Sequence, residues 1–303
     1  MKKLRVSSFG AAAFLFSAAA FGLPAPDPVL VGAGDISTCS NDGDERTAKL
    51  LDKIDGTVFT LGDNVYPNGT ASQFDRCYEP TWGRHKKRTR PVPGNHDYQT
   101  AGAAPYFAYF GDAAGDPKKG YYIYDLGTWH VVVLNSNCAE IGGCQKGSAQ
   151  EKWLRGDLAA HPTLCTLAMW HHPRFSSGTE HGSSKATVDF WRALQDAGAA
   201  VVLSGHDHDY ERFAPQDADG KADPERGIRE FVVGTGGKSF YQFGQPVANS
   251  EIRNANTYGV LKLTLHPDGY DWRFVPVEGG AFEDSGSAKC HAGGSIPTAP
   301  PRP

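Results

Sequence analysis

The segment Val201–Glu211 reads VVLSGHDHDYE and joins an apolar run directly to a cluster of side chains that can bind metal ions. The run Val201–Leu203 is short, apolar and mostly β-branched, which is typical of a buried strand. If the chain stays extended after Gly205, His206 and His208 point to the same side, because side chains alternate along an extended chain. The segment therefore predicts a strand whose end carries metal ligands.

Other strand-like runs end in the same way. Their terminal residues are carboxylates, an amide and imidazoles: Asp35 after VLVGAG, Asp63 after VFTLG, Asn95 and His96 after PVPG, and His171 after TLAMW. Most follow a glycine, which lets backbones approach one another closely. In open α/β sheets, ligands bind at the carboxyl ends of the strands. We therefore expect these strand ends to form one site together with the GHDH segment.

The rest of the chain alternates strand-like runs with helix-like ones, at residues 44–54, 148–160 and 186–198. Such alternation predicts α/β layers with buried strands. The runs at 120–134 and 261–277 each contain a turn signal between apolar halves, which indicates β-hairpins. The sheets should therefore be mixed rather than wholly parallel.

The N-terminus begins with MKKLR and continues with the apolar run FGAAAFLFSAAAF. A short positive region followed by a short apolar one is typical of a signal peptide, and the alternative is a retained N-terminal anchor. We predict a signal peptide at residues 1–25, one domain at 26–278, and a Gly/Pro-rich tail at 279–303 that is irregular unless Cys290 ties it down. The mature chain should be secreted or periplasmic.

Cysteine usage and charge narrow the class of protein. None of the six cysteines forms a CxxC pair, so disulfides are favoured over a zinc knuckle in an exported chain. Cys138 and Cys144 flank a short loop and are predicted to pair, while the other pairings stay open. The net charge of −4 does not favour a nucleic-acid partner or a stable membrane association. The basic run at 84–90 is either a solvated segment or a steering element for anionic substrates.

The side chains at the strand ends indicate which metals would bind. Carboxylates, imidazoles and an amide oxygen, without a thiolate, suit iron, zinc or manganese. One ion does not need so many ligands, and sites with two metal ions are a common solution for phosphoryl hydrolysis. The sequence GTGGKS lacks the first glycine of a P-loop, and no GxSxG motif is present, which disfavours a nucleotide-binding P-loop and a serine hydrolase.

The ordered series GD, GDNVY, GNHD, WHHP and GHDH resembles the calcineurin-like metallophosphoesterase superfamily, and GDNVY and GNHD are similar to the purple acid phosphatases. The resemblance implies a four-layer α/β/β/α sandwich with mixed sheets. It also implies a role for each matching residue: Asp35, Tyr66 and His208 on one metal, Asn95, His171 and His206 on the other, Asp63 as the bridge, His96 facing the phosphate and oriented by Asp97, and His181 as a second substrate-facing histidine.

One motif departs from the superfamily pattern. Ser37 stands where most members have a metal-binding histidine, two residues after Asp35. The purple acid phosphatase pattern supplies the tyrosine of GDxxY instead, and Tyr66 occupies that place. The resemblance therefore implies two metal ions, Fe(III) together with Fe(II), zinc or manganese.

The resemblance implies a phosphatase that hydrolyses phosphate monoesters of small molecules with a metal-activated hydroxide. A phosphodiesterase or nucleotidase on the same metal site is the nearest alternative, and a non-catalytic module that binds metal or phosphate is a further one. His172 either caps its strand or contacts substrate. The remaining histidines, including His130 and His161, have no motif around them and are predicted to be structural or solvated.

Overall fold

The structure is a computed structural model of the chain and describes Met1 and residues 26–291. The predicted signal peptide and the end of the predicted tail lie outside the described residues. Within the described part, no helix combines the length and the apolar character needed to cross a membrane.

Two mixed sheets form the centre of the molecule. The first sheet has six strands, in the spatial order β13 (Ser285–Lys289), β12 (Gly269–Pro276), β11 (Gly259–His266), β1 (Val29–Ala33), β2 (Thr57–Thr60) and β3 (Thr89–Arg90). The second has seven, in the order β10 (Ser250–Asn254), β8 (Tyr210–Phe213), β9 (Arg229–Val233), β7 (Val201–Ser204), β6 (Cys165–Met169), β5 (Trp129–Val133) and β4 (Tyr122–Leu126).

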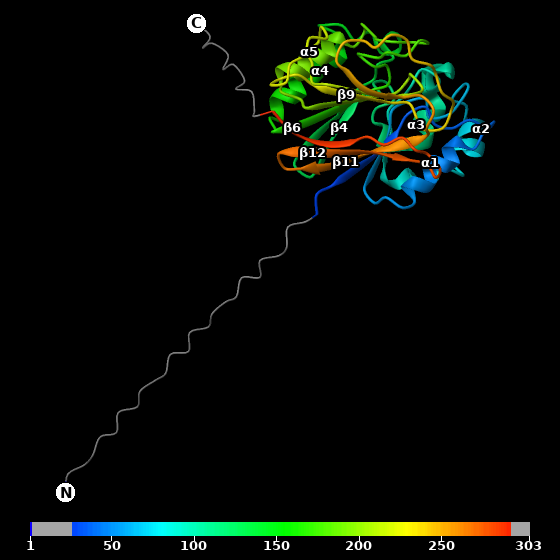
Figure 1. Cartoon of the computed structure of the whole chain (residues 1–303), viewed down its shortest axis with the longest axis horizontal. Helices are drawn as coiled ribbons and strands as arrows, with labels where there is room; N and C mark the ends of the chain where they lie inside the picture. Colours follow the sequence, from blue (N-terminus) through cyan, green and yellow to red (C-terminus); the bar gives the residue numbers. More distant parts are fainter. Residues whose placement is uncertain (2–25, 292–303) are drawn as a thin grey trace.

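Helices α4 (Ala149–Ala160) and α5 (Val188–Asp196) cover the outer face of the second sheet, and α1 (Gly43–Leu51) packs on the first sheet at β11. This gives the predicted four layers, while β12 and β13 keep exposed residues on their outer face (Figure 1). The other α-helices are α2 (Ala71–Gln73) and α3 (Ala104–Phe110). A π-helical segment spans Phe74–Tyr78, and 3-10 segments span Trp82–Arg88, Asp97–Gln99, Ala101–Ala103, Gly111–Ala114 and Cys138–Ile141.

The larger core lies between the sheets, where alternate residues of both sheets are buried against each other. Val31 and Leu261 of the first sheet belong to the same buried cluster as Val131 and Leu203 of the second. The opposite face of the second sheet packs on α4 and α5, with Trp191 completely buried. Both faces of the second sheet are thus covered, which explains why its strands are continuous apolar runs in the sequence.

Both predicted hairpins are present, as β4–β5 and β11–β12. The sequence pattern did not predict β8, β10 or β13, because these strands lack a strong apolar run and depend on pairing with a neighbour. β13 reads SGSAK and lies in the segment predicted as an irregular tail. It pairs with β12, and Cys290 directly after it bonds to Cys165 at the start of β6. The described part of the tail is therefore tied down by Cys290.

Three disulfides use all six cysteines. The predicted pair Cys138–Cys144 is confirmed. The other two join residues that are distant in sequence, Cys39 with Cys77 and Cys165 with Cys290.

Candidate metal centre

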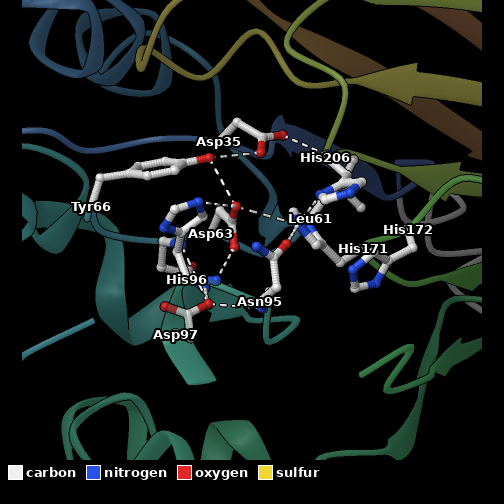
Figure 2. A network of polar contacts seen from close by, with 12 residues as sticks. Asp35, Leu61, Asp63, Tyr66, Asn95, His96, Asp97, His171, His172 and His206 are labelled. Atoms are coloured by element: carbon white, nitrogen blue, oxygen red, sulfur yellow. Dashed lines mark hydrogen bonds and ion pairs between the residues drawn. The ribbon is translucent and has the colours of Figure 1, made fainter. Parts of the chain in front are cut away.

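The polar residues that follow five strands meet in one buried cluster at the carboxyl ends of those strands, as predicted. Figure 2 shows side chains that come from the ends of β1, β2, β3, β6 and β7 and point toward a common centre. Two glycines permit this crowding. A Cβ on Gly94 would lie 2.1 Å from the backbone nitrogen of Asp63, and one on Gly205 would lie 2.7 Å from Asp35 Oδ2.

The backbone is strained at three residues of this cluster. Asp35, Asp63 and His206 have φ angles of 60°, 49° and 72°, a region that non-glycine residues seldom occupy. Such a conformation costs about 1–3 kcal/mol and persists only where the surrounding structure imposes it, most often at functional sites. The fold thus uses part of its stability to aim these three side chains.

Asp63 lies in the middle of the cluster and is almost completely buried. Its Oδ1 accepts a hydrogen bond of 2.8 Å from the backbone of His96. Its Oδ2 lies 3.0 Å from the Tyr66 hydroxyl and 3.4 Å from His171 Nε2. Burial raises the pKa of Asp63, but the contacts with His171 and His96 outweigh burial and lower it, so the carboxylate is ionised. A charged oxygen thus faces both halves of the cluster, the half around Tyr66 and the half around His171.

The Tyr66 hydroxyl lies between two carboxylates and an imidazole. It lies 2.9 Å from Asp35 Oδ1, 3.0 Å from Asp63 Oδ2 and 3.0 Å from His208 Nε2. Burial and the two carboxylates raise the pKa of Tyr66 well above its ordinary value of 10. One hydroxyl proton cannot satisfy both carboxylate oxygens, and such an excess of lone pairs around a point fits a bound cation. The donor set is a suitable one for a metal ion.

The histidine half of the cluster offers a second such arrangement. The buried His171 ring places Nδ1 2.6 Å from the carbonyl of Leu61, which can only accept, so Nδ1 carries a proton. Its Nε2 then faces Asn95 Oδ1 at 2.9 Å and His206 Nδ1 at 3.1 Å. Burial lowers the pKa of His171, but Asp63 raises it to about 9. The negative field of Asp63 therefore attracts a cation to this half as well.

Metal-binding groups occur in both halves. The candidate ligand atoms of Asp35, Asp63 and His171 lie within 4.8 Å of one another, and so do those of His171, His172 and His206. Burial and the neighbouring His171 lower the pKa of His206, so its imidazole is neutral and has a lone pair to offer. The structure thus contains a buried His/Asp site that fits metal ions.

His208 is held by two residues that belong to none of the five motifs. Its Nδ1 lies 2.8 Å from Ser239 Oγ, and its ring stacks on Tyr241 with 3.9 Å between ring centroids. Ser239 is the last residue of GTGGKS and Tyr241 follows two residues later, in a loop whose Lys238 backbone nitrogen donates to Asp35 O at 3.0 Å. The position of this glycine-rich loop after β9 was the only sequence signal for them.

His96 lies at the mouth of the site, with 32% of its side chain exposed. Its Nδ1 donates to the backbone carbonyl of Pro67 at 2.6 Å, and its ring lies 4.5 Å from that of Tyr66. The prediction that Asp97 orients this ring is wrong. The Asp97 carboxylate is buried and accepts hydrogen bonds from Gly94 N and Asn64 Nδ2, at 2.8 and 2.9 Å.

Asp97 therefore shapes the loop rather than the ring. Burial and the nearby Asp63 raise the pKa of Asp97 to about 7. By bonding Gly94 and Asn64 together, it holds the loop that carries Asn95 against the loop that carries Asp63.

Two further histidines border the cluster. The His181 ring stacks on His206, with 3.8 Å between centroids, as expected for a residue near the site. His172 lies 4.4 Å from His206 between ring centroids and 2.8 Å from Ser136 Oγ through Nδ1, so it is part of the site. Burial and His171 lower the pKa of His172 to about 3. Beside it lies an open cavity of about 400 Å³, lined by Asn95, Tyr98, Gln99, His172 and residues 136–140.

Comparisons with known proteins agree with this geometry. The family model described as calcineurin-like phosphoesterase matches residues 29–210. Two Arabidopsis thaliana proteins are similar: "Probable purple acid phosphatase 20", 26% identical over 60% of this chain and 45% of its own, and "Purple acid phosphatase 22", 29% identical over 72% and 55%. The chain thus spans about half the length of these curated relatives.

A purple acid phosphatase from yellow lupin seeds (Lupinus luteus) has the same fold. Its TM-score is 0.72 at 20% identity, over 88% of this chain and 54% of the lupin chain. The fold, the buried site and the family match over residues 29–210 lead to one assignment. The chain belongs to the calcineurin-like metallophosphoesterase family, with distant similarity to the purple acid phosphatases.

Proposed function

We propose that the chain is a phosphatase that hydrolyses phosphate monoesters with two metal ions. The observation that carries this proposal is the buried cluster in which Asp63 lies between two groups of lone pairs. Asp35, Tyr66 and His208 would hold one ion. The other would be held by Asn95, His171 and His206, and Asp63 would contact both.

The character of the donors supports the proposed pair of ions. A carboxylate and a phenol favour Fe(III) in the first position, and neutral amide and imidazole donors favour Fe(II), zinc or manganese in the second. When bound, such ions polarise a water molecule and neutralise the charge of a phosphate group. Three histidines, His96, His181 and His172, would orient the substrate, and His96 would transfer a proton to it.

His96 is the proposed catalytic residue at the leaving oxygen. Pro67 fixes the ring by accepting from Nδ1, so Nε2 is the atom that can face substrate. When Nε2 is also protonated, the imidazolium can stabilise developing charge or donate its proton to the leaving oxygen. His181, stacked on His206, is proposed as a second substrate contact, and the neutral His172 as a polar one at the rim of the cavity.

The cavity beside His172 supports the proposal that the substrate is a phosphate ester of an organic alcohol. Its lining is mostly uncharged and polar, apart from Glu140, so it can accept the alcohol part of an ester without a second phosphate. The rival function is a phosphodiesterase, which needs room for two ester arms. The third reading, a non-catalytic module, requires phosphate binding without turnover.

One comparison of substrates tests these readings. Metal-loaded protein is assayed with p-nitrophenyl phosphate and with bis(p-nitrophenyl) phosphate. The proposal expects the higher kcat/KM for the monoester. A higher kcat/KM for the diester would replace the proposal with a phosphodiesterase, and binding of inorganic phosphate without turnover of either ester would indicate the module.

The three disulfides support export to an oxidising compartment, because such bonds seldom persist in the cytosol. We propose that the mature protein is secreted or periplasmic and that the domain predicted at 26–278, together with β13 and Cys290, is the catalytic unit. N-terminal sequencing of the exported protein tests whether cleavage occurs near residue 25.

A further inference from the structure

A second cluster of metal-binding side chains lies at the far end of the strands from the candidate centre. His130 lies on β5, Asp157 on α4, and His161 directly follows α4. Their candidate ligand atoms all lie within 4.8 Å of one another. His130 pairs in register with Thr166 at the start of β6, whereas His171 follows the other end of that strand. The two clusters are therefore separate.

The His130 ring is completely buried, and each of its nitrogens faces a carboxylate. Nδ1 lies 3.1 Å from Asp125 Oδ1, and Nε2 lies 2.7 Å from Asp157 Oδ2. A neutral imidazole carries one N–H and can donate to only one of them. The other contact then needs a second proton or a metal ion beside the nitrogen.

His161 brings a third donor to the same place. Its Nδ1 lies 3.0 Å from Asp157 Oδ1 and 3.1 Å from the Asp157 backbone carbonyl, so a metal ion on Nδ1 would replace the proton that this carbonyl accepts. The His161 ring stacks on that of His130 with 5.1 Å between centroids. The Asp157 carboxylate, with only 7% of its side chain exposed, thus lies between two imidazoles. The His161 side chain is 48% exposed, so the cluster is open to solvent on one side.

We infer that His130, Asp157 and His161 form a binding site for a divalent transition-metal ion such as zinc, separate from the candidate metal centre. Two imidazoles and a carboxylate, with water in the fourth position, are a zinc-type ligand set. Bonds of about 2.0–2.2 Å place tetrahedral ligand atoms roughly 3.3 Å apart. His130 and His161 face different oxygens of Asp157, at 2.7 and 3.0 Å, and one candidate ligand atom of each residue lies within 4.8 Å of the others, so an ion would draw the three side chains only slightly closer together.

The contact with Asp125 supports a metal rather than a proton on Nε2. A metal-bound histidine usually donates its other N–H to a carboxylate, which fixes its tautomer. Asp125 lies opposite His130 in the β4–β5 register and is placed to accept from Nδ1. His130 Nε2 is then left as a ligand atom facing Asp157. An ion here joins β5 to the end of α4, so its role is structural.

Zinc counting in variants tests the site. Metal-depleted protein is titrated with zinc chloride, and bound zinc is measured after gel filtration. His161→Ala removes an exposed ligand with little risk to folding. The matched control is His266→Ala, since His266 also lies between two carboxylates, Asp27 and Asp271, at 2.6 and 3.2 Å, but without a second imidazole.

We expect His161→Ala to bind one zinc ion fewer per chain than the unaltered protein, and His266→Ala to bind the same number. Zinc at a hundredfold excess over its Kd should also raise the Tm of the unaltered protein by roughly 5–10 °C more than that of His161→Ala. Equal zinc counts in the unaltered protein and His161→Ala would overturn the inference, and so would an equal loss in both variants. The count is a difference, so its outcome is independent of whether the candidate metal centre is loaded or active.

Discussion

The two halves of the candidate metal centre differ in their donors and in their exposure to solvent. Asp35, Tyr66 and His208 form a half that is buried and contains the anionic or acidic donors. The half with Asn95, His171 and His206 offers an amide and imidazoles, and it lies beside the open cavity. Under the proposed function, the first half would hold the more highly charged ion, and the second half would hold a divalent ion beside the substrate.

We expect the largest effect from a substitution of Asp63, the residue that faces both halves. Asp63→Asn removes the charge that faces both, so we expect activity to fall to background and the content of both metals to drop. Asp35→Asn is the matched variant, because Asp35 faces the side chains of the first half and bonds to the second only through the backbone nitrogen of His206, so it should retain the second ion and more activity. Metal analysis and turnover of p-nitrophenyl phosphate check this. Full retention of both metals in Asp63→Asn would show that Asp63 does not bridge.

The next effect concerns a residue at the mouth that belongs to neither ligand set. His96→Ala should lower kcat by roughly a hundred- to ten-thousandfold, the range typical of a positioned acid. Metal content should stay unchanged, because the ring is anchored on the Pro67 carbonyl instead of a ligand. Elemental analysis alongside kinetics separates the two roles. Metal loss in proportion to activity would make His96 a ligand.

Tyr66→Phe breaks the first half alone. Burial and the carboxylates raise the pKa of Tyr66, so only a strongly polarising ion such as Fe(III) can remove its proton near neutral pH. We expect iron-loaded protein to be coloured and Tyr66→Phe to lose the visible absorption, with activity reduced less than in His96→Ala. The second ion should remain. A colourless, fully active protein containing only zinc or manganese would refute the ferric assignment but leave the phosphatase proposal intact.

The smallest effect tests the support behind the first half. Ser239→Ala removes the partner of His208 Nδ1, so we expect roughly tenfold weaker metal binding in that half, at the low end for an outer partner of a metal-bound histidine. Competition with a chelator measures the loss. Ser285→Ala, on the exposed edge strand β13, is the control. Equal metal affinity in both variants would show that Ser239 does not fix the ring.

Most of the candidate centre could be predicted from strand ends. Five of its residues each follow an apolar run, which the local sequence is enough to find: Asp35, Asp63, Asn95, His171 and His206. The partners of the histidines were harder to predict. His96 is held by the backbone carbonyl of Pro67, and any residue type can supply a carbonyl, so the sequence gives no sign of this contact. Ser239 bonds to His208 from a loop that is distant in sequence and outside the five motifs.

The edge strands show the same limit in the fold. β11 and β12 were predictable because each carries its own alternating apolar residues. β13 reads SGSAK and has none, so its strand conformation comes from hydrogen bonds to β12 and from the Cys165–Cys290 disulfide. The cysteine count predicted disulfides, but only the pair with a short loop, Cys138–Cys144, could be assigned from sequence.

The sequence by itself determined the layered α/β class, the order of the strand ends and the types of donor they carry, because these depend on short apolar periods and on the residues directly beside them. Only the tertiary structure decided which atoms face one another: Asp63 toward both halves, His96 toward Pro67 rather than Asp97, and His130 between Asp125 and Asp157. The physical reason is that these contacts join residues that are distant in sequence. They form only when the segments pack against each other, and the local sequence pattern does not specify the free energy of that packing.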